Sequence, residues 1–129
     1  MMDGELIHKE LSGQIINAAI QVINTLKPGL DEKLYENALL IELSERGHKI
    51  EQQKRHTVFY KEKRIGDLIP DIIVDEKVIV DPKVVTDFNE SHIAQMTGYL
   101  AITGLSLALL PNFKYSTLKW KRIVRSSSA

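Results

Sequence analysis

The stretch Pro70-Asp71-Ile72-Ile73-Val74-Asp75-Glu76-Lys77-Val78-Ile79-Val80-Asp81-Pro82-Lys83 decides the fold. Two β-branched runs flank a short polar segment, a pattern typical of a β-hairpin. A three-residue turn at 75–77 would pair Val74 with Val78 and place Asp71 opposite Asp81, whereas a two-residue turn would shift this register by one. Because side chains alternate between faces, one face is expected to hold Asp71, Ile73, Ile79, Asp81 and Lys83, and the other Ile72, Val74, Val78, Val80 and Pro82.

The two aspartates of this hairpin carry the chemical interest. Carboxylates directly opposite each other on paired strands lie about 5 Å apart at Cβ and repel. A shared proton or a cation must offset that repulsion, and Mg²⁺ typically takes one or two carboxylates plus waters and substrate phosphate. Lys83 would lie on the same face, within reach of water or phosphate at the metal. The competing interpretation is a surface hairpin with an ordinary Asp–Lys ion pair, which spacing alone favours because short acidic motifs match by chance.

The segments on both sides of the hairpin predict helices and strands. Apolar residues at steps of three and four predict helices over 6–26 and 31–46, separated by Lys27-Pro28-Gly29. Strand patterns run from Ile50 to 60 and over 64–68 around a polar turn at 61–63. A third helix is expected over 89–103, capped by Asn89 and closed by Gly104, followed by strands at 106–110 and 118–124. The order α-α-β-β-β-β-α-β-β predicts an α/β fold with a mixed sheet flanked by helices.

Composition sets limits on the class of protein. The chain has 129 residues, of which 43% are hydrophobic and 26% charged, as expected for a single globular domain over 1–125 with a loose tail at 126–129. Seventeen Lys and Arg balance seventeen Asp and Glu, which argues against a strongly basic, coat-like nucleic-acid binder but allows a local basic patch. The absence of cysteine excludes disulfides, thiolate nucleophiles and cysteine-based zinc sites.

The ends and the apolar runs of the chain bear on its location. Met1-Met2-Asp3-Gly4-Glu5 is acidic and lacks an apolar core region, so no secretory signal is expected. No apolar run approaches the length of a membrane span, and the longest, around 105–110, is short enough for a buried strand. We therefore expect a cytoplasmic protein that has no membrane as a partner.

Several motifs resemble a known family when they are taken together. Pro70-Asp71 followed by Asp81-Pro82-Lys83 is similar to the PD…(D/E)xK pattern of that nuclease superfamily. The segment 28–39, with Gly29, Glu32 and Tyr35, resembles the signature of the GxxExxY family within it. His92-Ile93-Ala94-Gln95, Tyr99-Leu100, Thr103-Gly104 and Leu110-Pro111-Asn112-Phe113 resemble the third helix and following strand of that family. The resemblance runs from about residue 8 to 124, with the motifs in the expected order.

The resemblance implies a PD-(D/E)xK nuclease-like fold and a Mg²⁺-dependent nuclease, with Mn²⁺ as an alternative cofactor and nucleic acid, DNA favoured, as the partner. Asp71 and Asp81 would be metal ligands and Lys83 the catalytic lysine. Glu32 would be a third acidic group near the metal, and Gln95 would help to hold Lys83, water or phosphate. His92, Tyr99 and Tyr35 are candidate substrate contacts, although Tyr35 is better explained by packing with a hydrogen-bonding tip. Glu36 is interpreted as a solvated carboxylate.

Two features keep other functions open. The family usually has Glu-Leu-Lys or similar where this chain has Asp81-Pro82-Lys83, and Pro82 removes a ladder donor, which predicts a bulge or an edge. A nuclease-fold module that binds nucleic acid or a protein with little or no cleavage is therefore the first alternative. The second is an interaction protein whose N-terminal helix, with Ile15-Ile16, Ile20 and Ile23, forms a homodimer face.

Basic clusters at 54–55, 61–64 and 119–125 are interpreted as solvated strand faces, with phosphate docking as the alternative.

Overall fold

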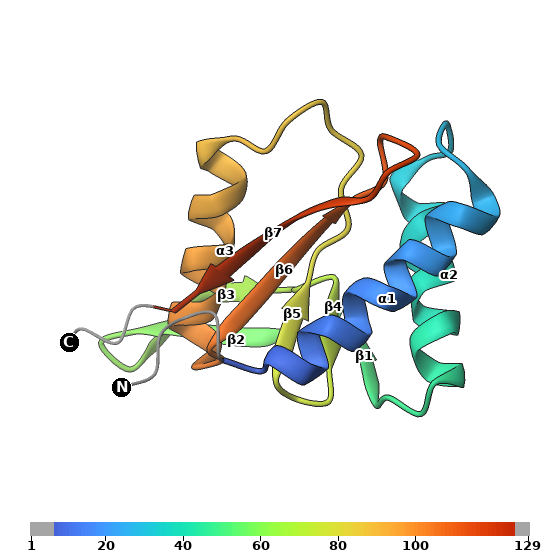
Figure 1. Cartoon of the computed structure of the whole chain (residues 1–129). Coiled ribbons are helices and arrows are strands. Elements are labelled where there is room, and N and C mark those ends of the chain that lie inside the picture. Colours follow the sequence, from blue (N-terminus) through green and yellow to red (C-terminus); the bar gives the residue numbers. More distant parts are fainter. Residues whose placement is uncertain (1–6, 126–129) are drawn as a thin grey trace.

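The computed structural model describes residues 7–125, and Figure 1 shows their arrangement. The expected tail at 126–129, the acidic start at 1–5 and the predicted helix start at Leu6 lie outside these residues. The helices are α1 (Lys9–Leu26), α2 (Glu32–Glu45) and α3 (Glu90–Thr103). The strands are β1 (Ile50–Gln52), β2 (His56–Tyr60), β3 (Lys63–Leu68), β4 (Ile72–Val74), β5 (Val78–Val80), β6 (Leu107–Asn112) and β7 (Lys119–Val124).

Five of the strands form a mixed sheet in the order β1-β4-β5-β6-β7, and β2 and β3 form a separate two-stranded sheet. The β5–β6 pair is parallel, whereas the other neighbours in the main sheet are antiparallel. Helices α1 and α2 cover one face of the sheet, and α3 covers the other, as the two hydrophobic cores show. The predicted mixed α/β sheet flanked by helices is therefore confirmed.

The helices begin and end where local chemistry requires. The stripe of apolar residues on α1 is buried against the sheet, and the helix ends before Lys27, which has a φ of 67° ahead of Pro28-Gly29. At the start of α3 the Asn89 side chain accepts a hydrogen bond from the His92 backbone N–H, as predicted for a cap. Gly104 ends α3 with a φ of 77°, a conformation that favours glycine.

The β4–β5 hairpin has the register that the three-residue turn predicts. Ile72 pairs with Val80, Ile73 with Ile79 and Val74 with Val78. Ile73 and Ile79 belong to the core beneath α3, whereas Ile72, Val74, Val78 and Val80 belong to the core beneath α1 and α2. Successive side chains along a strand point to opposite faces of the sheet. Asp71 and Asp81 therefore lie on the same side as Ile73 and Ile79, which is the α3 side.

Two details change or narrow the sequence prediction. The strand expected from Ile50 onward is two strands in different sheets, because Gln53, with a φ of 52°, turns the chain between β1 and β2. Of the bulge or edge predicted at Pro82, the structure has an edge on the β4 side, because the β4–β5 ladder ends at the Ile72–Val80 pair. On the β6 side there is no bulge, since the register continues unchanged to the Lys83–Asn112 bridge. The backbone N–H groups of Asp81 and Lys83 donate to Leu109 and Pro111 on β6, so the intervening proline nitrogen points away from β6 and no donor is lost there.

None of the helices in the described part of the chain combines the length and the apolar character that a membrane span needs.

Candidate active site

The two aspartates meet where the β4–β5 ladder ends. Asp71 precedes the first residue of β4 and Asp81 follows the last residue of β5, so they come directly after the Ile72–Val80 pair. Their carboxyl groups lie close enough to interact through a side-chain hydrogen bond when one of them is protonated. Asp81 is buried and Asp71 is partly buried. The sequence prediction that these carboxyl groups approach each other on one face is therefore confirmed.

The environment of Asp71 strongly favours its protonated form. Burial raises the pKa of this carboxyl, and the hydrogen bond and the negative charge of Asp81 raise it further, from 3.8 to about 7. The positive charges of Lys83 and Lys33 oppose the shift. Two carboxylates in close contact cannot both ionise without repulsion, so the pair holds a proton near neutral pH wherever no cation takes its place.

Lys83 lies against the same pair. Its Nζ atom is 3.4 Å from Oδ2 of Asp81, and its side chain is only 15% exposed. The backbone is fixed on both sides, because Lys83 N–H donates to Pro111 O at 2.8 Å and Lys83 O accepts from Phe113 N–H at 2.8 Å. The backbone of Lys83 therefore continues the line of β5, and its ammonium group lies at the carboxylate pair, as the register of the hairpin predicted.

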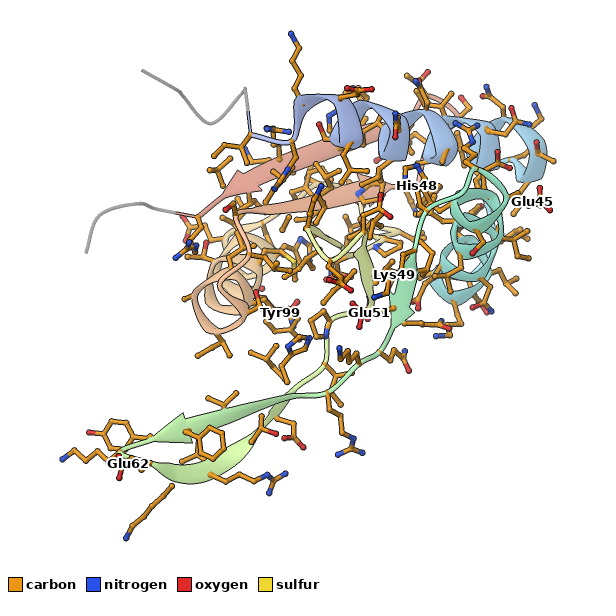
Figure 2. All side chains as sticks on the ribbon, turned by 90° about the horizontal axis from the view of Figure 1, so that it is seen from below. Glu45, His48, Lys49, Glu51, Glu62 and Tyr99 are labelled. Atoms are coloured by element: carbon orange, nitrogen blue, oxygen red, sulfur yellow. The ribbon has the colours of Figure 1, made fainter. Side chains whose placement is uncertain are left out.

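Helix α3 contributes polar side chains from above the pair. Burial raises the pKa of the Tyr99 hydroxyl, and the negative charges of Asp81 and Asp71 raise it further, with Lys83 opposing. Tyr99 therefore lies within electrostatic reach of the carboxylates, and Figure 2 shows it on the side of the sheet away from α1. Gln95 Nε2 donates to the Tyr99 hydroxyl at 3.4 Å. The shared helix face expected for these two residues is confirmed.

His92 lies one turn before Gln95 and has a structural contact. Its Nδ1 accepts the Asn89 backbone N–H at 3.2 Å, which completes a reciprocal cap with the Asn89 side chain. The imidazole is partly buried in this cap. Its other nitrogen, Nε2, is left for any contact with a substrate.

Glu32 approaches the site from α2 but does not join the carboxylate pair. Its Oε1 accepts the backbone N–H of Val84 at 3.2 Å, one residue after Lys83. Within residues 7–125 no three histidine, aspartate or glutamate side chains gather closely enough to hold a metal ion. The expectation that Glu32 is a third acidic group at the metal is therefore not supported, and its contact instead fixes the chain next to Lys83.

Glu36 is the residue that the sequence interpretation missed. It is buried, with an exposed fraction of 4%, rather than solvated. Its Oε2 accepts from Lys33 Nζ at 3.2 Å and from Gln52 Nε2 at 3.0 Å. Gln52 pairs with Ile72, the neighbour of Asp71, and the charge of Lys33 reaches Asp71. The available signal was spacing: Glu36 precedes Leu39 and Leu43 by three and seven residues, which places it on the buried face of α2.

Tyr35 has a packing role, which corrects its inclusion among candidate substrate contacts. Its side chain is fully buried and stacks on Phe113 with ring centroids 4.9 Å apart. Its hydroxyl donates to Lys27 O at 2.6 Å and accepts from Leu30 N–H at 3.1 Å. A buried ring with both hydrogen-bonding functions satisfied holds the α1–α2 loop and is not accessible to a substrate.

The carboxylate pair has the chemistry of a small hard-cation site. Mg²⁺ prefers oxygen ligands and commonly uses one or two protein carboxylates, with waters and substrate phosphate completing its octahedron. A positive charge between Asp71 and Asp81 would relieve the repulsion that helps to raise the Asp71 pKa. Asp71 and Asp81 therefore fit a divalent cation, whereas the described residues offer no larger ligand cage.

Comparisons with known proteins identify a matching family and two similar solved structures. The model of the PD-(D/E)XK nuclease superfamily matches residues 9–123. An alkaline exonuclease (LHK-Exo) from Laribacter hongkongensis has a similar crystal structure, with 14% identity and a TM-score of 0.49, over 84% of this chain and 76% of the other. LHK-Exo in complex with dAMP gives 13% identity and a TM-score of 0.48 with the same coverage. Among curated proteins nothing matches. Because the family match spans most of the sequence, the chain belongs to the PD-(D/E)XK nuclease superfamily.

Proposed function

We propose that the protein is a metal-dependent nuclease of the GxxExxY type that hydrolyses phosphodiester bonds of nucleic acid, with DNA favoured and Mg²⁺, or alternatively Mn²⁺, as cofactor. The observation that carries this proposal is the close pair of Asp71 and Asp81 carboxyl groups with Lys83 beside it. An ordinary surface hairpin would leave these groups solvated and apart. Here they converge at the end of two buried strands, where ionisation of both carboxyl groups needs a cation.

Each residue in the proposal has a role that follows from its position. Asp71 and Asp81 hold the cation through carboxylate oxygens. A bound divalent cation supplies Lewis-acid stabilisation of charge on the phosphoryl group and helps to activate water. Lys83 keeps a positive charge beside the pair, where it can bind a phosphate oxygen and stabilise the negative charge that develops on it. Gln95 and Tyr99 supply a hydrogen-bonded pair above the carboxylates that can orient water or phosphate.

The structure weakens one argument for a module that does not cleave. That argument was the bulge or edge expected at Pro82, either of which could have re-aimed Lys83. The strand extension is regular and Lys83 contacts Asp81. The shorter Asp81 in place of the usual glutamate remains a real departure, so cleavage is the deciding measurement.

The test is a cleavage screen over single-stranded, duplex and structured DNA and RNA, with Mg²⁺, Mn²⁺ or chelator. Cleavage is expected with divalent metal and not with chelator, and Lys83→Ala should abolish it. Lys77→Ala is the matched control, because Lys77 is exposed in the turn of the same hairpin. If no substrate is cut, or if Lys83→Ala cuts as well as the wild type, the chain is better described as a binding module.

A further inference from the structure

The β2–β3 hairpin projects from the body as an arm, defined here as residues 54–69. Figure 2 shows it extending away from the main sheet, with Glu62 at its tip. Large apolar side chains on it are exposed: Phe59 is 62%, Tyr60 63% and Ile65 66% exposed. Exposed aromatic side chains grouped on one element are characteristic of surfaces that bind a partner.

Each exposed ring on the arm faces a cation across the hairpin. Phe59 pairs with Arg64, and Tyr60 pairs with Lys63. Directly opposite side chains lie about 5 Å apart at Cβ and share a face. Lys61 adds a third cation at the tip, with its Nζ 5.5 Å from the centroid of the Tyr60 ring. Both faces of the ribbon tip therefore combine an aromatic ring with a positive charge.

Charge separates the arm from the rest of the molecule. Residues 54–69 contain five Lys or Arg and two Asp or Glu, so their net charge is +3, which leaves −3 for the remainder of a chain with no net charge. Arg55 and Arg64 form ion pairs with Asp67 at 3.2 and 2.8 Å. Within the described residues Lys61 and Lys63 are exposed and have no ion-pair partner. The tip of the arm therefore presents the basic groups that are available to an anionic ligand.

The root of the arm is joined to the candidate active site. The arm leaves the main sheet after β1 and returns to β4, and Gln53 N–H donates to Asp71 O at 3.0 Å across this junction. Only Ile69 and Pro70 separate β3 from Asp71. Figure 2 shows the arm on the side of the sheet away from α1, which is also the side of Tyr99. The register of β4–β5 places the carboxylate pair on this same side.

We propose that the arm binds an unpaired nucleic-acid strand and holds it beside the Asp71–Asp81–Lys83 site. Phe59 and Tyr60 would stack on bases, while Lys61 and Lys63 would contact the backbone phosphates. Stacking on aromatic rings needs bases whose faces are free, and a nearby positive charge follows the backbone without reading sequence. The proposal rests on the proposed nuclease function for its choice of partner and specifies how that substrate is held.

A second copy of the chain is the competing occupant of this apolar surface. Both outer edges of the two-stranded sheet are open, so two arms could pair. Pairing them would bring two sets of unpaired lysines together, and like charges oppose such contacts. A polyanion is complementary to the same groups, so the charge on the arm favours nucleic acid.

The experiment measures binding separately from cleavage. A fluorescein-labelled oligothymidylate and a labelled duplex are titrated with the full chain in chelator at low salt, and fluorescence anisotropy is recorded. Phe59→Ala and Tyr60→Ala should each weaken binding of the single strand by about tenfold. Trp120→Ala is the matched aromatic control, since Trp120 is 48% exposed on β7, and it should leave the affinity unchanged.

The charged residues give a second readout. Replacing Lys61 and Lys63 by Gln should weaken binding and reduce the slope of log affinity against log salt by roughly 0.7 for each phosphate that is no longer neutralised. The control is the same replacement at Lys119 and Lys121, which are exposed on β7. Thermal melts of all variants verify that the exposed substitutions leave the fold intact.

The outcomes separate the two proposals. Binding that needs the arm, without cleavage under any metal, keeps the arm and overturns the nuclease. Cleavage with unchanged binding in the arm variants keeps the nuclease and overturns the arm. The arm is also overturned if the wild type binds no single strand, if the variants affect only the duplex, or if they abolish a self-association instead.

Discussion

The molecule contains two consecutive antiparallel hairpins that differ in almost every physical respect. In β4–β5 all six strand residues are buried, and the hairpin lies between helices on both faces. In the β2–β3 arm no strand residue is buried, and Phe59, Tyr60 and Ile65 are more than half exposed. Burial brings carboxyl groups together at the end of the first hairpin and makes their charges interact strongly, whereas exposure leaves the second hairpin available to a large partner.

The largest expected effect tests the difference in burial. Ile79→Ala on β5 should lower the free energy of unfolding by about 2–5 kcal/mol, because it opens a cavity beneath α3. Ile65→Ala on the arm removes a side chain that is 66% exposed and should change stability by no more than about 0.5 kcal/mol. Urea denaturation of both variants measures the contrast. Similar losses for the two isoleucines would mean that the arm is packed against something in solution.

The second effect separates chemistry from binding. Lys83→Gln should lower kcat by roughly 10²–10³-fold, as expected for loss of a group that stabilises developing charge. Lys63→Gln on the arm should raise KM by less than about tenfold with kcat unchanged, because it removes only binding that substrate and transition state share. Steady-state cleavage kinetics provide both constants. A fall in kcat for Lys63→Gln would place the arm in the chemical step and erase the distinction between the two hairpins.

The two hairpins also differ in what their sequences reveal. Of the two turn lengths that the sequence left open, the three-residue turn gives the observed register of β4–β5, and each face of that hairpin is committed to a separate core. The convergence of Asp71, Asp81 and Lys83 followed from that register alone. In the arm, alternation predicted two strands, but not their separation from the main sheet, because that depends on the left-handed backbone at Gln53.

Residues on helices were harder to place from sequence than those on the hairpin. Gln95 and Tyr99 were correctly put on one helix face because their spacing is local. Glu32 and Glu36 are one turn apart on α2. Spacing to the apolar residues of α2 places Glu36 on the buried face, but the partner that it meets there depends on the packing of α2 against β1. That packing joins Glu36 to Gln52, sixteen residues away. A family signature at Glu32 could not supply this long-range contact.

The third effect concerns pH and metal at the buried hairpin. The folded pKa of Asp71 lies near 7, above its ordinary 3.8, so without metal stability should fall as pH rises between these values. The loss should be roughly 1–2 kcal/mol, since Asp71 is partly exposed to screening solvent. Asp71→Asn should remove the pH dependence and the stabilisation by Mg²⁺ or Mn²⁺. Thermal melts with metal or chelator across this pH range measure both, and identical wild-type curves with metal and with chelator would contradict a metal site here.

The smallest effect is expected at Asp67, four residues before Asp71 but on the arm. The hydrogen bond from Arg64 lowers its pKa below 3.8, against a burial effect of opposite sign, and Arg55 adds to the lowering. A carboxyl group whose pKa is lower in the folded protein than in the unfolded chain stabilises the fold at pH values above its unfolded pKa. This stabilisation is lost as the pH falls through the folded pKa. Asp67→Asn should therefore leave the melting temperature almost unchanged near neutral pH, because both arginines that pair with Asp67 are exposed and such ion pairs contribute little. The same substitution should also reduce the fall in melting temperature that the wild type shows in acid. Thermal melts in acidic and in neutral buffer measure this difference. A large loss at neutral pH would show that Asp67 anchors the arm, and the arm would then share the rigidity of the buried hairpin.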